Sequence, residues 1–190
     1  SPDSLSPLSV GNGDFAFTVD ITGLQTFPGF HERGIPLGTM SDWGWHTSKN
    51  PAAYSLDDVY RTYDVHGRKV NYVHQFRRNE DSARFSASEW LRNNPHKIHL
   101  GLIGLRLLNK DGKEAEISEI KNPVQTLDLW SGRVSSRFLV DDVPVNVEKV
   151  CHPDMDIVSA KISSPLIAEK RLIVRIDFPL GVSAPSGYDL

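Results

Sequence analysis

The sequence contains a single cysteine, Cys151, in 190 residues. One cysteine can form neither a disulfide within the chain nor a cysteine cluster that binds a metal ion. No apolar run approaches the roughly 20 residues that a membrane-spanning helix requires. Lysine and arginine form no block, and the formal net charge is -3. Neither nucleic acid nor an anionic membrane is therefore expected as a partner.

The bulk composition is that of an ordinary soluble globular protein. Hydrophobic residues make up 39% of the chain, and the mean hydropathy is -0.33. The chain is long enough for a sizeable core, and we expect residues 1–190 to form one domain. It begins at Ser1 without Met and shows no signal peptide, which fits a processed exported protein as well as a trimmed one. The compartment is therefore not fixed, and a periplasmic or extracellular location is favoured over a cytoplasmic one.

Short runs of alternating apolar and polar residues recur along the chain. In residues 15–21, Phe15, Phe17 and Val19 recur with the period of a half-buried strand. The last third contains further strand-like runs, at 125–130, 134–140, 143–150, 157–162 and 171–178. Turn residues separate these runs, and no long amphipathic helix is present. The sequence therefore predicts an all-β fold, an antiparallel β-sandwich with one or two short helices, rather than a βαβ protein.

Shorter elements are expected between these runs. We predict strands at 24–27, 99–108 and 114–120, and a hairpin formed by residues 60–65 and 69–74. Ser55 begins a sequence typical of a capping box. A short helix is expected at 88–92, and it should end before Pro95, because the residue that precedes a proline avoids the helical region.

The irregular stretch 34–50 is the strongest candidate for a binding site. It places Asp42, Trp43, Trp45 and His46 close together without the period of a helix or a strand. An indole packs on the C–H face of a sugar ring while neighbouring polar groups bind its hydroxyls. We therefore predict that these residues, together with Asn12, bind carbohydrate. The alternatives are that both tryptophans plug one end of the domain and that Asn12 only shapes a turn.

We expect no catalytic residue, no bound metal and no cofactor in this chain. None of the seven histidines has a carboxylate partner that the sequence singles out. His96 and His99 are three positions apart in a segment where their side chains should point to opposite faces. Cys151 is interpreted as a small apolar residue at a strand end. Trp90 and Trp130 lie in regular runs and are predicted to pack in the core or on a sheet face.

Several segments form a pattern that is familiar as a set: LSVGNGDFAF at 8–17, TGLQTF at 22–27, IPLGT at 35–39, WGWH at 43–46, NPHKIHLG at 94–101 and LDLWSG at 127–132. Over nearly the whole chain this pattern resembles the N-terminal β-sandwich domain of bacterial proteins similar to glycoside hydrolase family 65. That family contains maltose and kojibiose phosphorylases and related hydrolases.

The resemblance implies a sandwich of the galactose-mutarotase-like type, which in that family precedes an (α/α)6 helical barrel. The barrel supplies the general-acid Glu and binds the substrate, while loops of the sandwich lean over the pocket. The family chemistry is inverting attack by water or phosphate on a glycosidic bond. This chain would then be a non-catalytic N-terminal domain that packs on a helical catalytic domain, and we expect the natural chain to continue past Leu190. A self-standing carbohydrate-binding module, a purely structural domain and a mutarotase-like epimerase stay open as alternatives.

Overall fold

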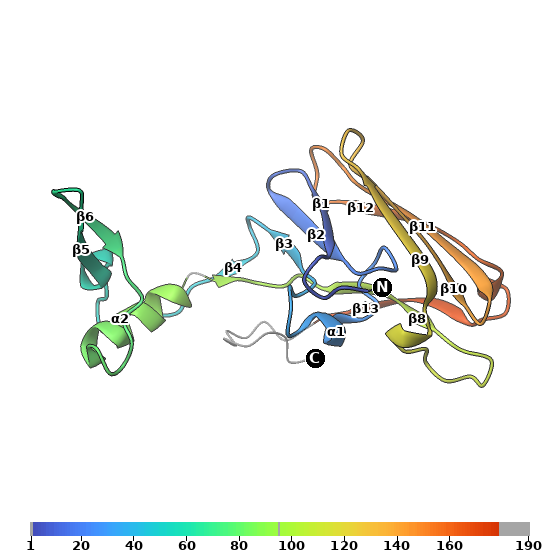
Figure 1. Ribbon diagram of the computed structural model, residues 1–190, viewed down its shortest axis with the longest axis horizontal. Coiled ribbons are helices and arrows are strands. Elements are labelled where there is room, and N and C mark those ends of the chain that lie inside the picture. Colours follow the sequence, from blue (N-terminus) through green and yellow to red (C-terminus); the bar gives the residue numbers. More distant parts are fainter. Residues whose placement is uncertain (1, 95, 179–190) are drawn as a thin grey trace. The chain divides into compact units, whose positions relative to one another are not determined.

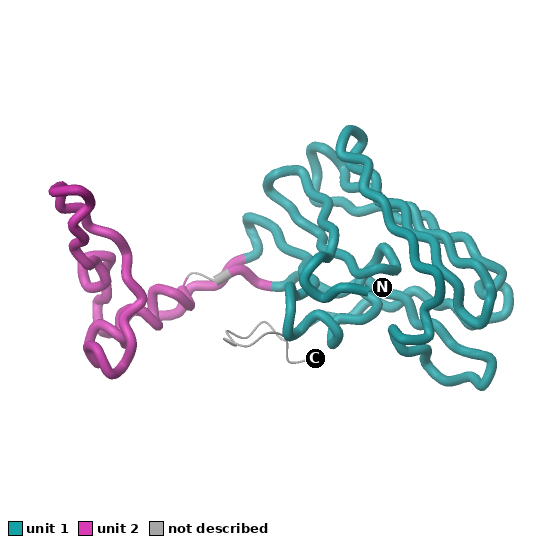
Figure 2. Tube along the Cα trace, in the orientation of Figure 1, with its two compact units in different colours: residues 1–44, 99–190 teal, residues 45–98 magenta. Residues whose placement is uncertain are grey.

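The computed structural model describes residues 2–94 and 96–178. The chain divides into two compact units, which Figure 2 shows in different colours. Residues 1–44 and 99–190 form unit 1, and residues 45–98 form unit 2. The expectation of a single domain over residues 1–190 stays a prediction.

Unit 1 is built from antiparallel strands (Figure 1). Its largest sheet has four strands in the order β12-β11-β10-β9, and a three-stranded sheet β1-β2-β3 and the pair β13-β8 supply the rest. The bounds are β1 Leu8–Gly11, β2 Phe15–Val19, β3 Thr39–Ser41, β8 Leu102–Leu107, β9 Lys121–Asp128, β10 Arg133–Val140, β11 Val143–Cys151, β12 Val158–Ser163 and β13 Leu172–Asp177. Short helical segments are α1 Pro28–His31, η2 Ile117–Glu119 and η3 Pro165–Ile167. The predicted all-β antiparallel sandwich is confirmed.

The core of unit 1 forms because alternate residues of its strands turn to the same side. β10 buries Val134 and Phe138, and β11 buries Val145 and Val147. These residues belong to one apolar cluster with Phe17 of β2 and with apolar residues of β1 and β8. Full burial of such a side chain contributes about 1.5–3 kcal/mol. The period-two pattern of the sequence thus corresponds to the two faces of each strand.

A lysine continues the buried row of β11. Lys149 is only 1% exposed, and its Nζ lies 4.8 Å from the centroid of the Phe17 ring. Among the described residues this nitrogen has no hydrogen-bond partner. Burial disfavours the charged ammonium and lowers the pKa of Lys149 to about 7, although the charges of Cys151 and Asp20 act in the opposite direction. Unit 1 therefore carries an ionisable amine inside its core.

The segment after β2 packs against β8 through main-chain contacts. The Gln25 N–H donates to the Ile103 carbonyl over 2.8 Å, and the Ile103 N–H donates to Oε1 of Gln25 over 3.0 Å. Gly104 makes this approach possible, since an added Cβ would lie 2.4 Å from the Gln25 carbonyl oxygen. Side chains larger than hydrogen are therefore excluded at this position of β8.

Two of the predicted strands are wrong. Residues 24–27 form no strand, because the carboxylate of Asp20 accepts the N–H groups of Thr22 and Phe27 and holds the segment in turns. Residues 114–120 also form no strand. They make one isolated bridge, and the Glu119 carboxylate then accepts the Glu116 N–H at the start of η2. In both places a side-chain carboxylate takes main-chain donors that a strand would have used.

β13 is an edge strand with an unusually apolar surface. Among the described residues it pairs only with β8. Its Ile173, Val174 and Ile176 are all exposed. Natural edge strands usually carry charges, prolines or bulges that prevent further pairing, and of these β13 contains the charged pair Arg175 and Asp177. β13 therefore offers both apolar side chains and unpaired main-chain groups to a partner.

Unit 2 contains a hairpin, a helix and a short strand pair. Its elements are β4 Trp45–His46, η1 Leu56–Val59, β5 Tyr60–Val65, β6 Arg68–Val73, α2 Ser82–Arg92 and β7 His96–Lys97. β5 and β6 confirm the predicted hairpin. The helix begins six positions before the expected Ser88, because the Asp81 carboxylate caps it by accepting the N–H groups of Ala83 and Arg84. No helix of the described part of the chain is long and apolar enough to cross a membrane.

Candidate functional site

The candidate site begins where β3 ends in a tight turn. The Gly44 N–H donates to the Ser41 carbonyl over 3.3 Å, so that Asp42 and Trp43 occupy the two corner positions. The main chain of Asp42 is fixed in turn by a hydrogen bond to the Asp14 carbonyl, 2.8 Å away. A side chain at position 44 would require Leu100 to shift, because an added Cβ would lie 2.9 Å from Cδ2 of Leu100. The turn therefore projects Asp42 and Trp43 from a fixed base.

Trp43 is exposed and yet held at one edge. Its indole is 64% exposed, and Nε1 donates to Oδ2 of Asp156 over 2.8 Å. The buried Ser41 hydroxyl donates to the same carboxylate oxygen over 2.5 Å. An exposed side chain normally samples several rotamers, and this hydrogen bond favours one orientation of the ring.

Asp156 lies in the connection between β11 and β12. Hydrogen bonds from the side chains of Ser41 and Trp43, with a smaller contribution from Asn12, hold its pKa below the ordinary value of 3.8. The residue is thus a carboxylate at neutral pH, when it can accept all of these donors. It ties three segments of unit 1 together around the Trp43 indole.

Asn12 has a structural role in the turn between β1 and β2. Its Oδ1 accepts the N–H of Asp14 over 3.1 Å and the N–H of Phe15 over 2.8 Å. This leaves the amide nitrogen directed to the Asp156 carboxylate. Asn12 therefore shapes its turn, as one of the alternatives held, and also reaches the group that anchors Trp43.

The other two predicted residues belong to unit 2. Trp45 and His46 form β4, where Trp45 pairs with Lys97 and His46 pairs with His96. Trp45 is 54% exposed. The predicted set is thus divided: the structure groups Asn12, Asp42 and Trp43 in unit 1 and places Trp45 and His46 in a two-residue strand of unit 2.

Sequence reasoning missed Ser41 and Asp156. Ser41 adjoins the predicted residues and could have been included, because a hydroxyl beside an aromatic turn is a natural hydrogen-bond donor. Asp156 is 113 positions from Trp43. No local pattern connects the two residues, so only the tertiary structure identifies this partner.

One tryptophan was assigned wrongly. Trp130, predicted to pack, is 98% exposed at the tip of the β9–β10 hairpin. The strand period ends at Asp128, whose carboxylate accepts the Trp130 N–H and the Ser131 hydroxyl and so turns the chain. Trp90 behaves differently: it is partly buried on α2 and donates from Nε1 to the Lys49 carbonyl over 3.2 Å.

Burial shifts the pKa values of two titratable residues of unit 1, His99 and Cys151. Burial lowers the pKa of His99, whose Nε2 donates to the Leu37 carbonyl while Nδ1 accepts the Gly101 N–H. Burial raises the pKa of the Cys151 thiol, which keeps it protonated and weakly nucleophilic. In the described ranges no three His, Cys, Asp or Glu residues are grouped closely enough to hold a metal ion.

Comparisons with known proteins give no match: no family model, no curated protein and no solved structure corresponds to this chain. The class is therefore defined by the fold alone. The protein is an antiparallel β-sandwich whose sequence is interrupted, between residues 44 and 99, by a second compact unit. On the surface of unit 1, the exposed indole of Trp43 is held by its hydrogen bond to Asp156.

Proposed function

We propose that unit 1 is a carbohydrate-binding β-sandwich domain and that Trp43 is the platform on which a sugar ring packs. The observation that carries this proposal is the combination of an exposed indole face with an indole edge bonded to Asp156. An aromatic ring that is already oriented loses little conformational entropy when a ligand binds. An indole without this hydrogen bond would lose more conformational entropy when the sugar binds, and its stacking would contribute less to the affinity.

The polar groups around the indole suit the other half of a sugar. Asp42 is exposed beside Trp43, and its carboxylate can accept hydrogen bonds from sugar hydroxyl groups. Asp156 has two carboxylate oxygens, and Oδ2 accepts the hydrogen bonds from Ser41 and Trp43. Its Oδ1 is a further acceptor close to the indole. A ring with an apolar face and equatorial hydroxyls matches this arrangement.

The wider proposal follows the family resemblance. Unit 1 would be part of the non-catalytic N-terminal domain of a glycoside hydrolase or phosphorylase, and Trp43 would face a sugar pocket completed by a helical catalytic domain. Trp45 and His46 would contribute from unit 2. A self-standing carbohydrate-binding module remains the alternative, in which the sugar affinity needs no second domain.

A second candidate function is docking. It is favoured by β13, whose Ile173, Val174 and Ile176 are exposed on an edge strand. Exposed apolar surface of this kind marks an interface with another protein part. On this reading unit 1 serves as a structural platform for a neighbouring domain.

Isothermal titration of the 190-residue chain with neutral gluco-, galacto- and rhamno-oligosaccharides tests the proposal. We expect saturable binding that Trp43→Ala weakens about tenfold or more. Asp156→Ala should weaken binding less, because the stacking face remains and only its orientation is released. Trp130→Ala is the matched control, since Trp130 is the more exposed tryptophan and its indole has no hydrogen-bond partner among the described residues.

The outcomes separate the two candidates. Equal losses in Trp43→Ala and Trp130→Ala would show that any exposed indole binds sugar weakly, and the Trp43 platform would be refuted. No binding at millimolar sugar would leave docking as the better function. Trp45→Ala, measured alongside, reports whether unit 2 takes part.

A further inference from the structure

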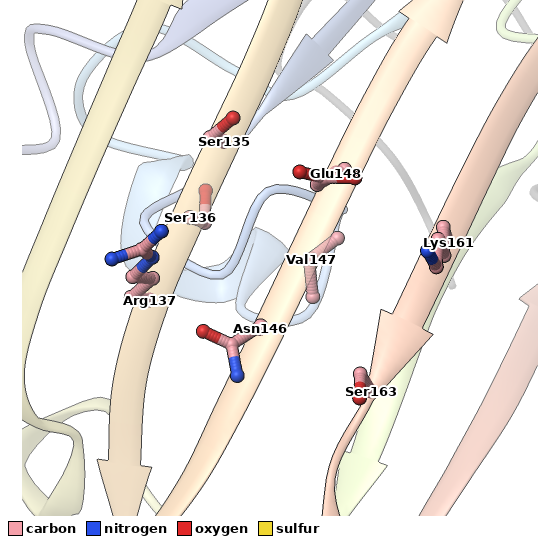
Figure 3. A pocket seen from close by; sticks show the side chains of 8 residues that line it. All are labelled: Ser135, Ser136, Arg137, Asn146, Val147, Glu148, Lys161 and Ser163. Carbon is pink, nitrogen blue, oxygen red and sulfur yellow. The ribbon is translucent and has the colours of Figure 1, made fainter.

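The outer face of the four-stranded sheet carries two rows of polar side chains. On β11, Glu148 is opposite Ser135 of β10 and Lys161 of β12. Two positions along, Asn146 is opposite Arg137 and, on β12, Ser163. Figure 3 shows these six side chains on three neighbouring strands. They line a hollow of about 270 Å³.

The size of this hollow suits a small ligand. Ser136 and Val147, which also line it, are buried residues whose side chains belong to the core. The main chain at these two positions therefore forms the floor, and the polar side chains form the walls. Its volume lies just below the usual range for small-molecule sites, which is room for about one sugar ring.

The charged and amide groups of the hollow are free of protein partners. Among the described residues, no hydrogen bond or ion pair involves the side chains of Arg137, Asn146, Glu148 or Lys161. Opposite charges placed directly across two strands usually attract each other into a pair. Glu148 and Lys161 are such a couple, and Figure 3 shows their charged ends apart. The hollow thus keeps both donors and acceptors available.

The pairing of β9 with β10 is irregular beside Arg137. The register of β9 and β10 shifts between Arg137 and Leu139, and Asn122 on β9 has a positive φ of 48°. Such irregularities include β-bulges, which occur next to binding sites, where they redirect a side chain. The β9 residue opposite Arg137 is the apolar Val124. β9 therefore supplies no carboxylate opposite Arg137 that would compete for its guanidinium group.

From this arrangement we propose that the hollow binds a uronic acid residue of an acidic saccharide. The Arg137 guanidinium matches a carboxylate with two parallel hydrogen bonds. Asn146, Glu148 and the serines offer donors and acceptors for ring hydroxyls. Arg137 and Lys161 are positively charged and Glu148 is negatively charged, so the hollow has one net positive charge. One sugar carboxylate would neutralise it. Glu148 repels a second anion, so an acidic peptide or a polysulfated chain fits this site less well.

This site is independent of the Trp43 platform, because the two share no residue. The test uses the ¹⁵N-labelled 190-residue chain, titrated with galacturonate, which carries one carboxylate, and with neutral galactose while main-chain amide shifts are followed. We expect saturable shifts in β10, β11 and β12 with the uronate only. Arg137→Ala should weaken the uronate affinity about tenfold or more, and added salt should weaken it in the wild type.

Three further arms make the test decisive. Arg137→Gln keeps a polar side chain of similar length and guards against a folding defect in Arg137→Ala. Arg68→Ala removes an exposed arginine of the unit 2 hairpin and should leave the affinity unchanged. Poly-glutamate tests the acidic-peptide alternative. Equal shifts with neutral and acidic sugar, retained uronate affinity in both Arg137 variants, or stronger binding of poly-glutamate would each overturn the proposal. Neutral-sugar binding alone, with the Trp43 dependence described above, would support that platform and refute this site.

Discussion

The carboxylate of Asp156 accepts the indole N–H of Trp43 over 2.8 Å, although the two residues are 113 positions apart in the chain. The bond joins the turn after β3 to the connection between β11 and β12. It combines two properties that rarely coincide on a protein surface, since the aromatic face is open to solvent while the ring edge is fixed. The orientation of this ring therefore depends on a charge that can be removed by acid.

The first prediction is that the Trp43 indole N–H resonance titrates with Asp156. Hydrogen bonds from Ser41 and Trp43 lower the pKa of this carboxyl below 3.8. The stabilisation they provide is present above the ordinary value and is lost as the pH falls through the lowered pKa. NMR from about pH 6 to about pH 2 should give a midpoint below 3.8. Asp156→Asn should abolish the titration. A midpoint of the Trp43 indole resonance at or above pH 3.8 would contradict the hydrogen bond between Trp43 and Asp156.

The second prediction concerns the amine in the core. The pKa of Lys149 is about 7 in the folded protein, against 10.5 for an ordinary lysine. Between these values the unfolded chain holds a proton that the folded chain lacks, so the free energy of unfolding rises with pH across this window. The difference corresponds to roughly 5 kcal/mol of stability absent below pH 7. Lys149→Met should remove this dependence and stabilise the protein at neutral pH by a few kcal/mol.

Urea unfolding at about pH 7, 8 and 9 measures the effect. Asp20 and Cys151 are the groups whose charges act on Lys149, and their own titration largely cancels when the variant is compared with the wild type at each pH. Lys161→Met, at an exposed position of β12, is the matched control. Parallel pH profiles for wild type and Lys149→Met would show that the buried amine keeps its proton in the folded state.

The third prediction is that Gly104→Ala destabilises unit 1 strongly. The new Cβ would lie 2.4 Å from the Gln25 carbonyl oxygen, which is main chain and cannot rotate away. Strain of this kind costs about 1–3 kcal/mol or more. Gly29→Ala is the control, because the nearest atom there is 3.9 Å from the added Cβ. Thermal unfolding followed by circular dichroism should separate the two variants, and equal midpoints would refute the close approach.

The fourth prediction is that Ile176→Lys on β13 reduces self-association of the chain. An apolar edge strand pairs with other chains, and a lysine blocks such pairing. Val124→Lys places the same charge on the exposed face of β9, the edge strand that already contains Pro123 and a register shift. Sedimentation at rising protein concentration should show a clear effect for Ile176→Lys and little for Val124→Lys. Equal effects would mean that surface charge, rather than the β13 edge, controls association.

The sandwich could be predicted from sequence because its strands obey a local rule. Val143, Val145 and Val147 alternate with Pro144, Asn146 and Glu148, and the structure places the three valines on one face of β11. Lys149 continues that face and is buried. From its residue type alone, a lysine would be expected to face solvent. Its position is fixed by strand register, and a one-residue slip would have turned the valines outward.

The features that the sequence analysis missed are of two kinds, those encoded in a local pattern and those that depend on distant contacts. The Asp81 cap of α2 was within reach of sequence reasoning, since an aspartate before a helical run is a known start signal. The turn that exposes Trp130 was also encoded nearby, in Asp128 and Ser131. The anchor of Trp43 was not, because Asp156 approaches it only after two sheets have assembled. Of the five predicted site residues, Asn12 and Trp43 are thus connected to Asp156 only by the tertiary structure.

The insertion of unit 2 closes on itself. β4 and β7, at its two ends, pair with each other, and within unit 1 a Cβ added to Gly44 would lie only 2.9 Å from Cδ2 of Leu100. The pairing of β4 with β7 therefore helps to offset the entropic cost of bringing the two ends of residues 45–98 together. Because that entropy grows only with the logarithm of loop length, doubling the insertion would cost about 0.6 kcal/mol. The sandwich can consequently accept a longer, shorter or differently folded insert at this point while its own strand pairing stays intact.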